Sequence, residues 1–301
     1  THLIAHILKT AGKKVSFVSS VYASIGGKES DIGFHVTTPS SFALQKLLKQ
    51  SVYNCDEYFV LETTSHALDQ NRVWGIKYEV GVITNITHEH LDYHKTYEEY
   101  AKIKQRLLKM AKIGIKNTSE ITNIVKKIPN LTKFNQNNYS SAYAVCKQLG
   151  LSDEIILKAM KTFVLPKGRL DLVYDKDFKV IIDFAHTPNA LLQLLPEIRK
   201  LYLKKGGRLI HVFGSAGLRD FTKRPLMGMA SSKSADIIFI TEEDYRTESL
   251  EKICQQIASG IKNKNYQIVL NRQEAISQAI KSAKKDDVVV LTGKSHEKSL
   301  C

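Results

Sequence analysis

Residues 85 to 94 bring together several groups that can bind a metal or move a proton. This segment follows the apolar run Val80–Ile83 and contains three histidines, two carboxylates and an asparagine. A helical pattern with Lys102 and Lys104 comes next. Because open α/β sheets place their chemistry at strand ends, the segment is predicted to lie at the centre of an active site. Three other interpretations of the histidines stay open: a solvated loop, a structural zinc site and half of a metallohydrolase motif.

Two more polar clusters lie in the first half of the chain. Thr37 and Thr38 stand just before a predicted helix, where hydroxyl groups also serve as N-caps. Glu62 closes an apolar strand, and a carboxylate in that place is either a helix cap or a metal ligand. Each cluster therefore keeps a structural interpretation beside a functional one.

The second half of the chain has a glycine-rich turn followed by cations. The turn is Gly214–Gly217, and Arg219, Lys223 and Arg224 come after it. Backbone amides of such a turn can approach a polyphosphate closely, and the cations would neutralise its charge. Other polar clusters follow apolar runs at residues 183–188, 241–246 and 293–297.

The elements that must position these groups alternate between apolar runs and helical patterns, which predicts an α/β protein with two domains. The domain boundary is expected near residue 165, which gives domains of residues 1–165 and 166–301. The predicted strands are 15–18, 58–61 and 80–83 in the first domain, and 180–184, 208–213, 237–241, 267–270 and 288–292 in the second. Their apolar character predicts largely parallel sheets that are covered on both faces. Helices are predicted from residue 3 to the stop at Gly12, from Pro39 with an inner face of Leu44, Leu47 and Leu48, and over 138–149 and 153–163.

The composition is that of a globular protein with a strong basic excess. The 301 residues include 44 basic and 30 acidic side chains, a net charge of +14. The lysines are scattered and lack the interleaved aromatic residues of a nucleic-acid platform, so a phosphate-rich small substrate or a lysine-rich proteome is the preferred explanation. The four cysteines form no CxxC pair, as expected in a reduced cytoplasmic protein. No apolar run is long enough to span a membrane, and no signal peptide is visible.

Taken together, the polar clusters resemble those of the Mur ligases, the ATP-dependent amide-forming enzymes of peptidoglycan synthesis in the bacterial cell wall. Nine motifs occur in that family's order across nearly the whole chain: TTPS, ETTSHALDQNRV, TNITHEHLDYH, a YxxxK helix, FNQNN, KGRLD, DFAHTP, FGSAGLRDFTKRPLMG and GKSHE. The resemblance implies a P-loop-type central domain and a Rossmann-like C-terminal domain. It is greatest for the members that extend a UDP-muramoyl dipeptide.

The resemblance also implies a magnesium site and a two-step reaction. Glu62 and His90 would bind Mg²⁺ next to the γ-phosphate of ATP, and Lys104 would be carbamylated and support a second ion. A free ammonium repels Mg²⁺, whereas a carbamate is an anionic oxygen ligand. A substrate carboxylate would first form an acyl phosphate, and the amine of an amino acid would then displace the phosphate.

Further roles carry over from the family residue by residue. The UDP-muramoyl dipeptide would contact Thr37, Thr38, Ser65, Gln70 and Arg72. The nucleotide would contact Asn85, Asn138, Arg169, Asp183 and His186, with Arg219 and Lys223 facing phosphate. The incoming amino acid would contact Arg246, Gly293 and Glu297. An arginine for a carboxylate favours meso-diaminopimelate over L-lysine. Only small-molecule partners are implied, with no nucleic acid and no membrane, and a monomer is expected.

The chain departs from the family pattern in several places. It has no GxxxxGK[ST] motif, and it starts with a segment that resembles the helix after that motif. This predicts a fragment without the P-loop and N-terminal domain, with weak or no activity. The short stretch between Leu108 and Phe134 predicts an incomplete central sheet with an exposed edge. The family usually has DNPR where this chain has the residues ending in Arg246.

Other functions were weighed against this one. His88-x-His90-x-Asp92 resembles a metallohydrolase motif, but Tyr93 intervenes before His94 and no downstream histidine set completes a dinuclear site. Related ligases, such as folylpolyglutamate synthetase, cyanophycin synthetase or the lipid II-amidating subunit, are disfavoured by the SHAL, TEEDYR and GKSHE motifs. A truncated form that only binds substrates or partners is the non-enzymatic alternative.

Overall fold

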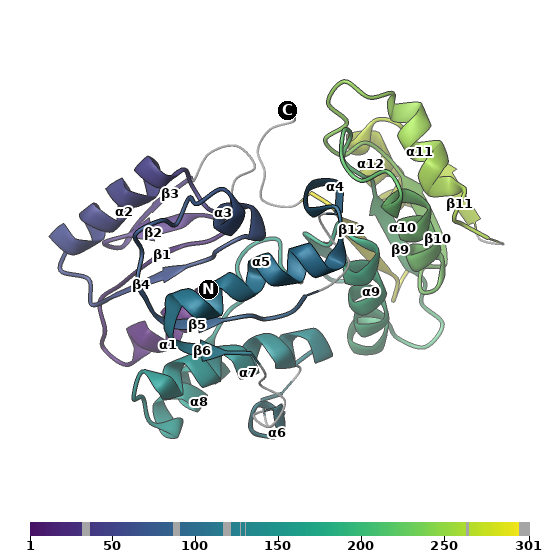
Figure 1. Ribbon diagram of the computed structural model, residues 1–301. Coiled ribbons are helices and arrows are strands. Elements are labelled where there is room, and N and C mark those ends of the chain that lie inside the picture. Colours follow the sequence, from purple (N-terminus) through teal and green to yellow (C-terminus); the bar gives the residue numbers. More distant parts are fainter. Residues whose placement is uncertain are drawn as a thin grey trace. The chain divides into compact units, whose positions relative to one another are not determined.

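The computed structural model describes residues 1–31, 37–86, 91–116, 122–126, 128–129, 131–262 and 265–294, with only the backbone at 91, 92 and 122 (Figure 1). The chain divides into two compact units, Thr1–Val164 and Leu165–Cys301. Each unit is an α/β structure with parallel strand pairs, so the predicted fold class is confirmed. Among the described residues, no helix is both long and apolar enough to cross a membrane.

The larger sheet of the first unit has the strand order β3-β2-β1-β4. Strands β1 (Val15–Val18) and β4 (Tyr58–Leu61) pair in parallel and have the predicted bounds. Strands β2 (Ala23–Ile25) and β3 (Lys28–Ser30) form an antiparallel hairpin that was not predicted. Its turn is Gly26–Gly27, with φ of +55° and +81°. A Gly-Gly pair is a hairpin signal because both turn positions need positive φ.

A second sheet of the first unit pairs β5 (Tyr78–Val82) with β6 (Ala111–Ile115) in parallel. The crossover between them contains α4 (Leu91–His94) and α5 (Tyr97–Met110). Helix α5 lies close to the sheet, because a Cβ on Gly81 would be 3.2 Å from the Leu107 carbonyl oxygen. Strand β6 was not predicted, and β4 stands at the edge of its own sheet.

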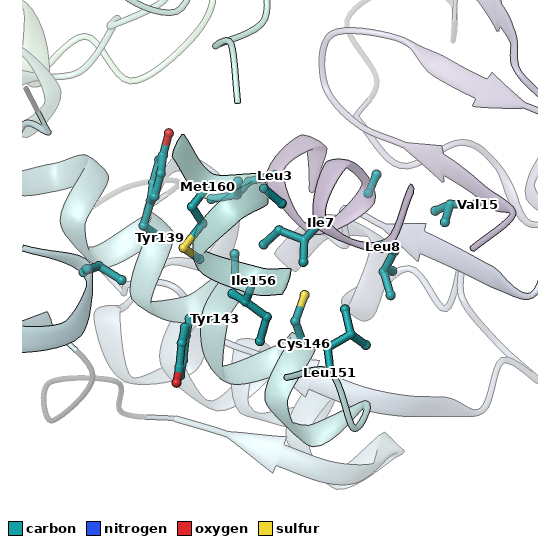
Figure 2. Packing of buried hydrophobic residues seen from close by; sticks show 14 of the residues in the cluster. Leu3, Ile7, Leu8, Val15, Tyr139, Tyr143, Cys146, Leu151, Ile156 and Met160 are labelled. Carbon is teal, nitrogen blue, oxygen red and sulfur yellow. The ribbon is translucent and has the colours of Figure 1, made fainter. Parts of the chain in front are cut away.

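The core of the first unit forms where α1 (His2–Thr10) packs on α7 (Lys133–Gln148) and α8 (Asp153–Thr162). Figure 2 shows apolar side chains from these helices pointing toward one another, including Leu3, Ile7, Cys146, Ile156 and Met160. A fully buried aliphatic side chain contributes about 1.5–3 kcal/mol through the hydrophobic effect. This cluster therefore holds α1 against the rest of the unit.

Helix α2 (Ser41–Tyr53) begins two residues later than predicted, because Pro39 and the N-cap Ser40 precede its first turn. Of its predicted inner face, Leu44 is buried and Leu48 packs on the same small cluster as Leu68. The remaining short helices of this unit are α3 (Ser65–Asp69) and α6 (Thr122–Val125).

The second unit is built on a six-stranded sheet with the order β11-β10-β9-β12-β8-β7. The strands are β7 (Asp171–Asp175), β8 (Lys179–Asp183), β9 (Leu209–Phe213), β10 (Ile237–Ile240), β11 (Asn265–Ile268) and β12 (Val288–Thr292). All neighbours are parallel except β7, which is antiparallel to β8 and was not predicted. The helices are α9 (Pro188–Tyr202), α10 (Lys223–Ser232), α11 (Leu250–Ala258) and α12 (Arg272–Ser282).

The parallel register aligns the strand ends that precede the polar clusters of this unit. Thr292 at the end of β12 pairs with Asp183 at the end of β8, and Ile240 at the end of β10 pairs with Phe213 of β9. The segments beginning at residues 184, 214, 241 and 293 therefore leave the same edge of the sheet, which is where open α/β sheets bind ligands.

Candidate active site

In the first unit, the end of β4 is joined to the loop before α2 by the Thr38 hydroxyl. This hydroxyl donates to the Glu62 carbonyl oxygen at 2.8 Å and accepts from the Thr64 amide at 3.1 Å. The Thr38 side chain is fully buried. It therefore positions the loop that carries Thr37, and a direct substrate contact from Thr38 stays a prediction.

The two capping alternatives left open by the sequence are resolved by neighbouring residues. Ser40 caps α2 by accepting from the Ala43 amide, and Thr64 caps α3 by accepting from the Ala67 amide. Glu62 caps neither helix. Its Oε2 accepts a hydrogen bond from the Ser20 amide at 3.1 Å, and a carboxylate has further lone pairs for a cation.

The predicted substrate residues Gln70 and Arg72 lie in one hydrogen-bonded network with Thr38. The Arg72 guanidinium donates to the Thr38 carbonyl oxygen at 2.9 Å and to Gln70 Oε1 at 2.8 Å. Gln70 in turn donates to the Tyr93 hydroxyl at 3.2 Å, which donates to Asp69 at 2.8 Å. The network fixes the Arg72 side chain before any ligand is bound. Tyr93 and Asp69 were not predicted as site residues.

Ser65, at the start of α3, is held by a histidine at the end of α4. The Ser65 hydroxyl shares a hydrogen bond of 2.9 Å with His94 Nε2, and both side chains are buried. His94 also contacts the rings of His66, Tyr93 and Tyr100. These contacts give His94 a positioning role next to Ser65. His90 and His88 lie outside the described residues.

Lys104 lies on α5, and its ammonium reaches the segment after β5. Its Nζ donates to the Asn85 carbonyl oxygen at 2.8 Å and to the Tyr100 hydroxyl at 3.3 Å. Thr96 caps α5 and fixes the start of the helix. The structure thus brings together two of the residues predicted for the nucleotide and metal site. Asn138 is exposed on α7 and donates to Asn135.

The donor groups of the first unit limit how it could bind a metal ion. Within the described part of the chain, no group of three or more His, Cys, Asp or Glu side chains is placed to hold a metal ion. Mg²⁺ needs few protein ligands when phosphate oxygens and water complete its shell. The Glu62 carboxylate therefore fits a magnesium site that depends on a bound phosphate.

In the second unit, three residues predicted to contact the nucleotide lie close to one another around Phe184. The Arg169 guanidinium lies 4.6 Å from the centre of the Phe184 ring, and His186 packs edge-on against the same ring. Lys223 donates to the His186 carbonyl oxygen at 3.2 Å. Arg169 and His186 thus pack on Phe184, and Lys223 is bonded to the backbone beside that ring. Such a combination of cations and an aromatic ring suits a nucleotide.

Asp183 is almost fully buried, and its carboxylate holds the backbone on both sides. One oxygen accepts from the Leu170 amide at 2.8 Å and the other from the Ala185 amide at 2.9 Å. Burial raises the pKa of Asp183, while these amides and Arg169 oppose the shift. Asp183 therefore ties the segment containing Arg169 to the end of β8. Its contact with ribose hydroxyls stays a prediction.

The loops after β9 (residues 214–222) and β10 (residues 241–249) carry the predicted arginines Arg219 and Arg246. Arg219 is exposed, and Arg246 is partly buried with its Nε 3.4 Å from an Asp244 oxygen. Leu218 and Arg246 have positive φ, +52° and +53°. Such a conformation costs a non-glycine residue about 1 to 3 kcal/mol, and it is concentrated at functional sites.

The Arg224 side chain does not face a polyphosphate site, contrary to the prediction from the sequence. Its side chain is fully buried and forms an ion pair with Glu248 at 2.7 Å. The prediction for Arg224 is therefore wrong, because the guanidinium is already bound inside the protein. Sequence spacing alone did not reveal the partner, which lies on the next loop.

Gly293 follows β12 with φ of +88°, and it lies next to the loops that follow β9 and β10. A Cβ there would lie 3.6 Å from Glu243 Cγ and 3.8 Å from the Gly214 carbonyl oxygen. The start of the GKSHE motif is thus adjacent to the β9 and β10 loops. Glu297 lies outside the described residues.

Two family models match the two units in order. The Mur ligase middle domain matches residues 1–156, and the Mur ligase, glutamate ligase domain matches residues 168–295. The chain belongs to the Mur ligase family.

Similar proteins make the comparison more specific. UDP-N-acetylmuramoyl-L-alanyl-D-glutamate–2,6-diaminopimelate ligase 1 of Clostridium acetobutylicum is 37% identical over 99% of this chain and 70% of its own length. The ligase of the same name from Aquifex aeolicus is 35% identical over the same shares.

Solved structures support the same fold. A diaminopimelate ligase structure of this type is 25% identical, with a TM-score of 0.59 over 99% of this chain and 71% of that one. A bifunctional folylpolyglutamate synthase/dihydrofolate synthase from Yersinia pestis, complexed with AMPPNP and Mn ion, has a TM-score of 0.72 at 18% identity. It covers 97% of this chain and 82% of that one. At that identity the likeness shows the fold alone.

Proposed function

We propose that the protein is an ATP-dependent ligase that adds meso-diaminopimelate to UDP-N-acetylmuramoyl-L-alanyl-D-glutamate in peptidoglycan synthesis. The observation that carries this proposal is the 37% identity with a diaminopimelate ligase across 99% of the chain. A folylpolyglutamate synthase function has less support, because solved structures of that class are only 18–19% identical.

In the proposed reaction, a carboxylate oxygen of the dipeptide attacks the γ-phosphorus of ATP and ADP leaves. The amine nitrogen of the acceptor then attacks the acyl carbon, loses a proton and displaces phosphate. Mg²⁺ would neutralise the phosphate charge during the first step. Residues 1–165 would bind the dipeptide and the phosphates, and residues 166–301 would bind the nucleotide and the acceptor. The protein would work as a monomer in the cytoplasm.

Several side chains would hold these substrates. Arg72, preset by Gln70 and Thr38, would bind an anionic group of the dipeptide. Arg169 and His186 would face the nucleotide. Arg246 would bind the distal carboxylate of diaminopimelate, which L-lysine lacks, and this difference would favour diaminopimelate.

Phosphate release from the intact protein tests the reaction. The assay contains UDP-muramoyl-Ala-Glu, ATP and either diaminopimelate or lysine. Preferential turnover with diaminopimelate is expected. No turnover with either amino acid would reject the ligase function, and equal use of both would reject the role of Arg246.

A second test concerns Lys104. If its carbamate supports the phosphate site, Lys104→Ala abolishes turnover and short carboxylates such as acetate restore part of it. The Lys102→Ala variant, two residues away on the same helix, is the matched control and keeps its activity. Loss in Lys104→Ala without rescue would leave Lys104 a cationic rather than a carbamylated role.

A further inference from the structure

The buried Arg224 is the central group of a junction between the β9 and β10 loops. Its Nη1 and Nη2 donate to the two Glu248 oxygens, each at 2.7 Å. Nη1 also donates to Gln256 at 2.6 Å, and Nη2 donates to the Ala216 carbonyl oxygen at 3.1 Å. An end-on, two-point pairing of this kind fixes direction as well as distance. Arg224 on α10 therefore binds the Ala216 carbonyl group of the β9 loop and the Glu248 carboxylate of the β10 loop.

Glu248 completes the junction from the opposite side. Besides its pairing with Arg224, Oε2 accepts a hydrogen bond from the Leu218 amide at 3.0 Å. The bonds from Arg224 and from this amide lower the pKa of Glu248 to about 2. Glu248 is thus ionised at neutral pH and links the β10 loop to the residue directly before Arg219.

The two loops also meet through their backbones. The Gly217 amide donates to the Asp244 carbonyl oxygen at 2.8 Å. A Cβ on Gly217 would lie 2.0 Å from the Tyr245 carbonyl oxygen, so no larger residue fits there without movement. These contacts place the backbone of one loop directly against the residues that precede Arg246.

Each loop has its left-handed residue next to the junction. Leu218 precedes Arg219 and donates its amide to Glu248, while Arg246 itself is left-handed. A strained conformation persists only where the surroundings determine it. The junction holds Leu218 in this conformation through the bond from its amide to Glu248, and it thereby fixes the position of Arg219.

We propose that Arg224 and Glu248 are positioning residues that hold Arg219 and Arg246 in the geometry required to bind the carboxylates of the amino-acid acceptor. This moves Arg219 from the phosphate-facing role expected from the sequence to the acceptor, because the junction holds the residue before Arg219 against the loop that carries Arg246. This inference rests on the proposed ligase function. Arginine binds a carboxylate strongly only when its planar donors meet both oxygens, so a shift of the loop weakens binding without removing any charge. Neither Arg224 nor Glu248 needs to touch the acceptor.

The test uses two variants of the junction in the intact protein. Glu248→Gln keeps the shape of the side chain and removes its charge. The double variant Arg224→Met/Glu248→Met replaces the ion pair with apolar side chains of similar length, a change that often preserves stability. Asp287→Asn is the matched control, because the buried Asp287 pairs with the partly exposed Arg208 at a place remote from both loops.

Steady-state kinetics and hydrogen exchange are measured on each variant. Both junction variants should raise KM for diaminopimelate about tenfold or more, as expected for misplaced binding groups. KM for ATP and for the UDP-dipeptide should stay within about twofold. Dipeptide-dependent positional isotope exchange in ATP, which reports acyl phosphate formation without acceptor, should be unchanged. Amide exchange should accelerate at Gly217 and Leu218 in these variants and not in Asp287→Asn.

The outcomes separate this inference from the proposed function. If the unaltered protein shows isotope exchange and turnover but the double variant keeps its acceptor KM, the positioning role is overturned. If exchange accelerates in both loops while the acceptor KM stays constant, the junction serves stability alone and the proposal also fails. If the unaltered protein shows neither isotope exchange nor turnover, the ligase function itself is rejected.

Discussion

The six-stranded sheet of the second unit has an arginine–carboxylate junction at each end, and the two junctions connect different parts of the fold. At the amino end, Asp287 accepts from the Arg208 guanidinium and from the amides of Arg208 and Lys284. It joins the starts of β9 and β12 directly. At the carboxyl end, Arg224 and Glu248 join two loops that lie beyond the strands.

The same type of ion pair can thus serve either the sheet or the binding of a ligand. The amino-end junction fixes the spacing of strands whose backbone hydrogen bonds already hold them. The carboxyl-end junction fixes segments that have few ladder hydrogen bonds of their own and that carry exposed or half-buried arginines. Loss of the first should therefore lower stability, and loss of the second should lower binding more than stability.

Asp287→Ala gives the largest expected effect on stability. It leaves a partly buried Arg208 without its partner and removes the acceptor of two backbone amides, so it should cost about 3–5 kcal/mol. Urea unfolding at pH 7 measures this change. The comparison would break if acceptor KM rose in Asp287→Ala as much as in Glu248→Gln.

The buried His211 and the Glu248 junction should lose their contributions to stability in different pH ranges. Burial, helped by Arg272, lowers the pKa of His211 to about 3, and its ring nitrogens bond Ser231 and Thr292. The unfolded chain binds more protons than the folded one between about pH 6.5 and pH 3. His211 therefore stabilises the unit above pH 6.5, and this contribution is lost as the pH falls toward 3.

His211→Gln tests whether the titration of His211 causes this loss of stability. The amide keeps a donor and an acceptor but does not titrate, so the fall in stability between pH 7 and pH 4.5 should become shallower. Urea unfolding at both pH values measures the slope. Equal slopes in the two proteins would contradict the assignment. The pKa of Glu248 is lowered from its ordinary value of 4.5 to about 2. Glu248 therefore contributes to acid unfolding only below about pH 4.5.

Two glycines provide a matched pair of substitutions at the opposite ends. A Cβ on Gly217 would lie 2.0 Å from the Tyr245 carbonyl oxygen, and one on Gly207 would lie 2.2 Å from that of Asp286. Alanine at either position should cost about 1–3 kcal/mol, since the backbone must move to admit it. Only Gly217→Ala should also raise acceptor KM. Equal kinetic effects from the two variants would remove the distinction between the ends.

The smallest effect is expected at an exposed ion pair near the amino end. Lys204 pairs with Asp286 at 3.1 Å, and the lysine side chain is 70% exposed. Lys204→Ala should change the free energy of unfolding by less than about 1 kcal/mol. A larger loss in urea unfolding would mean that burial does not separate strong from weak pairs at this end.

The sequence predicted most of the regular structure because the buried strands are short, continuous apolar runs. Strands β1, β4 and β12 have their predicted bounds, and the α/β class followed from the alternation of elements. The antiparallel strand β7 was missed because its apolar run, Leu172–Tyr174, is only three residues long and stands between two aspartates, and three of its five residues are exposed. The β2–β3 hairpin was missed although Gly26–Gly27 indicates a turn of that kind.

For the candidate site, the sequence predicted some of the residues that lie near one another, and their roles stay predictions. Motif order identified residues that the structure brings together, such as Gln70 with Arg72 and Asn85 with Lys104. Burial and pairing could not be predicted, because they depend on which loop lies opposite. Arg224 was therefore expected to face phosphate, and Glu248 was not considered. The positioning roles of Tyr93 and His94 likewise depend on contacts with α3 that no local pattern contains.

The fully buried hydroxyl of Thr38 has a consequence for how ligands act on the first unit. It donates to the chain at the end of β4 and accepts from the start of α3, so the loop before α2 and the cap of α3 share one hydrogen-bonding group. A ligand that orders one of these segments lowers the conformational entropy left to the other. If the predicted substrate contacts at Thr37 and Ser65 are made, their binding free energies would be linked through Thr38, and by reciprocity each contact would strengthen the other to the same degree.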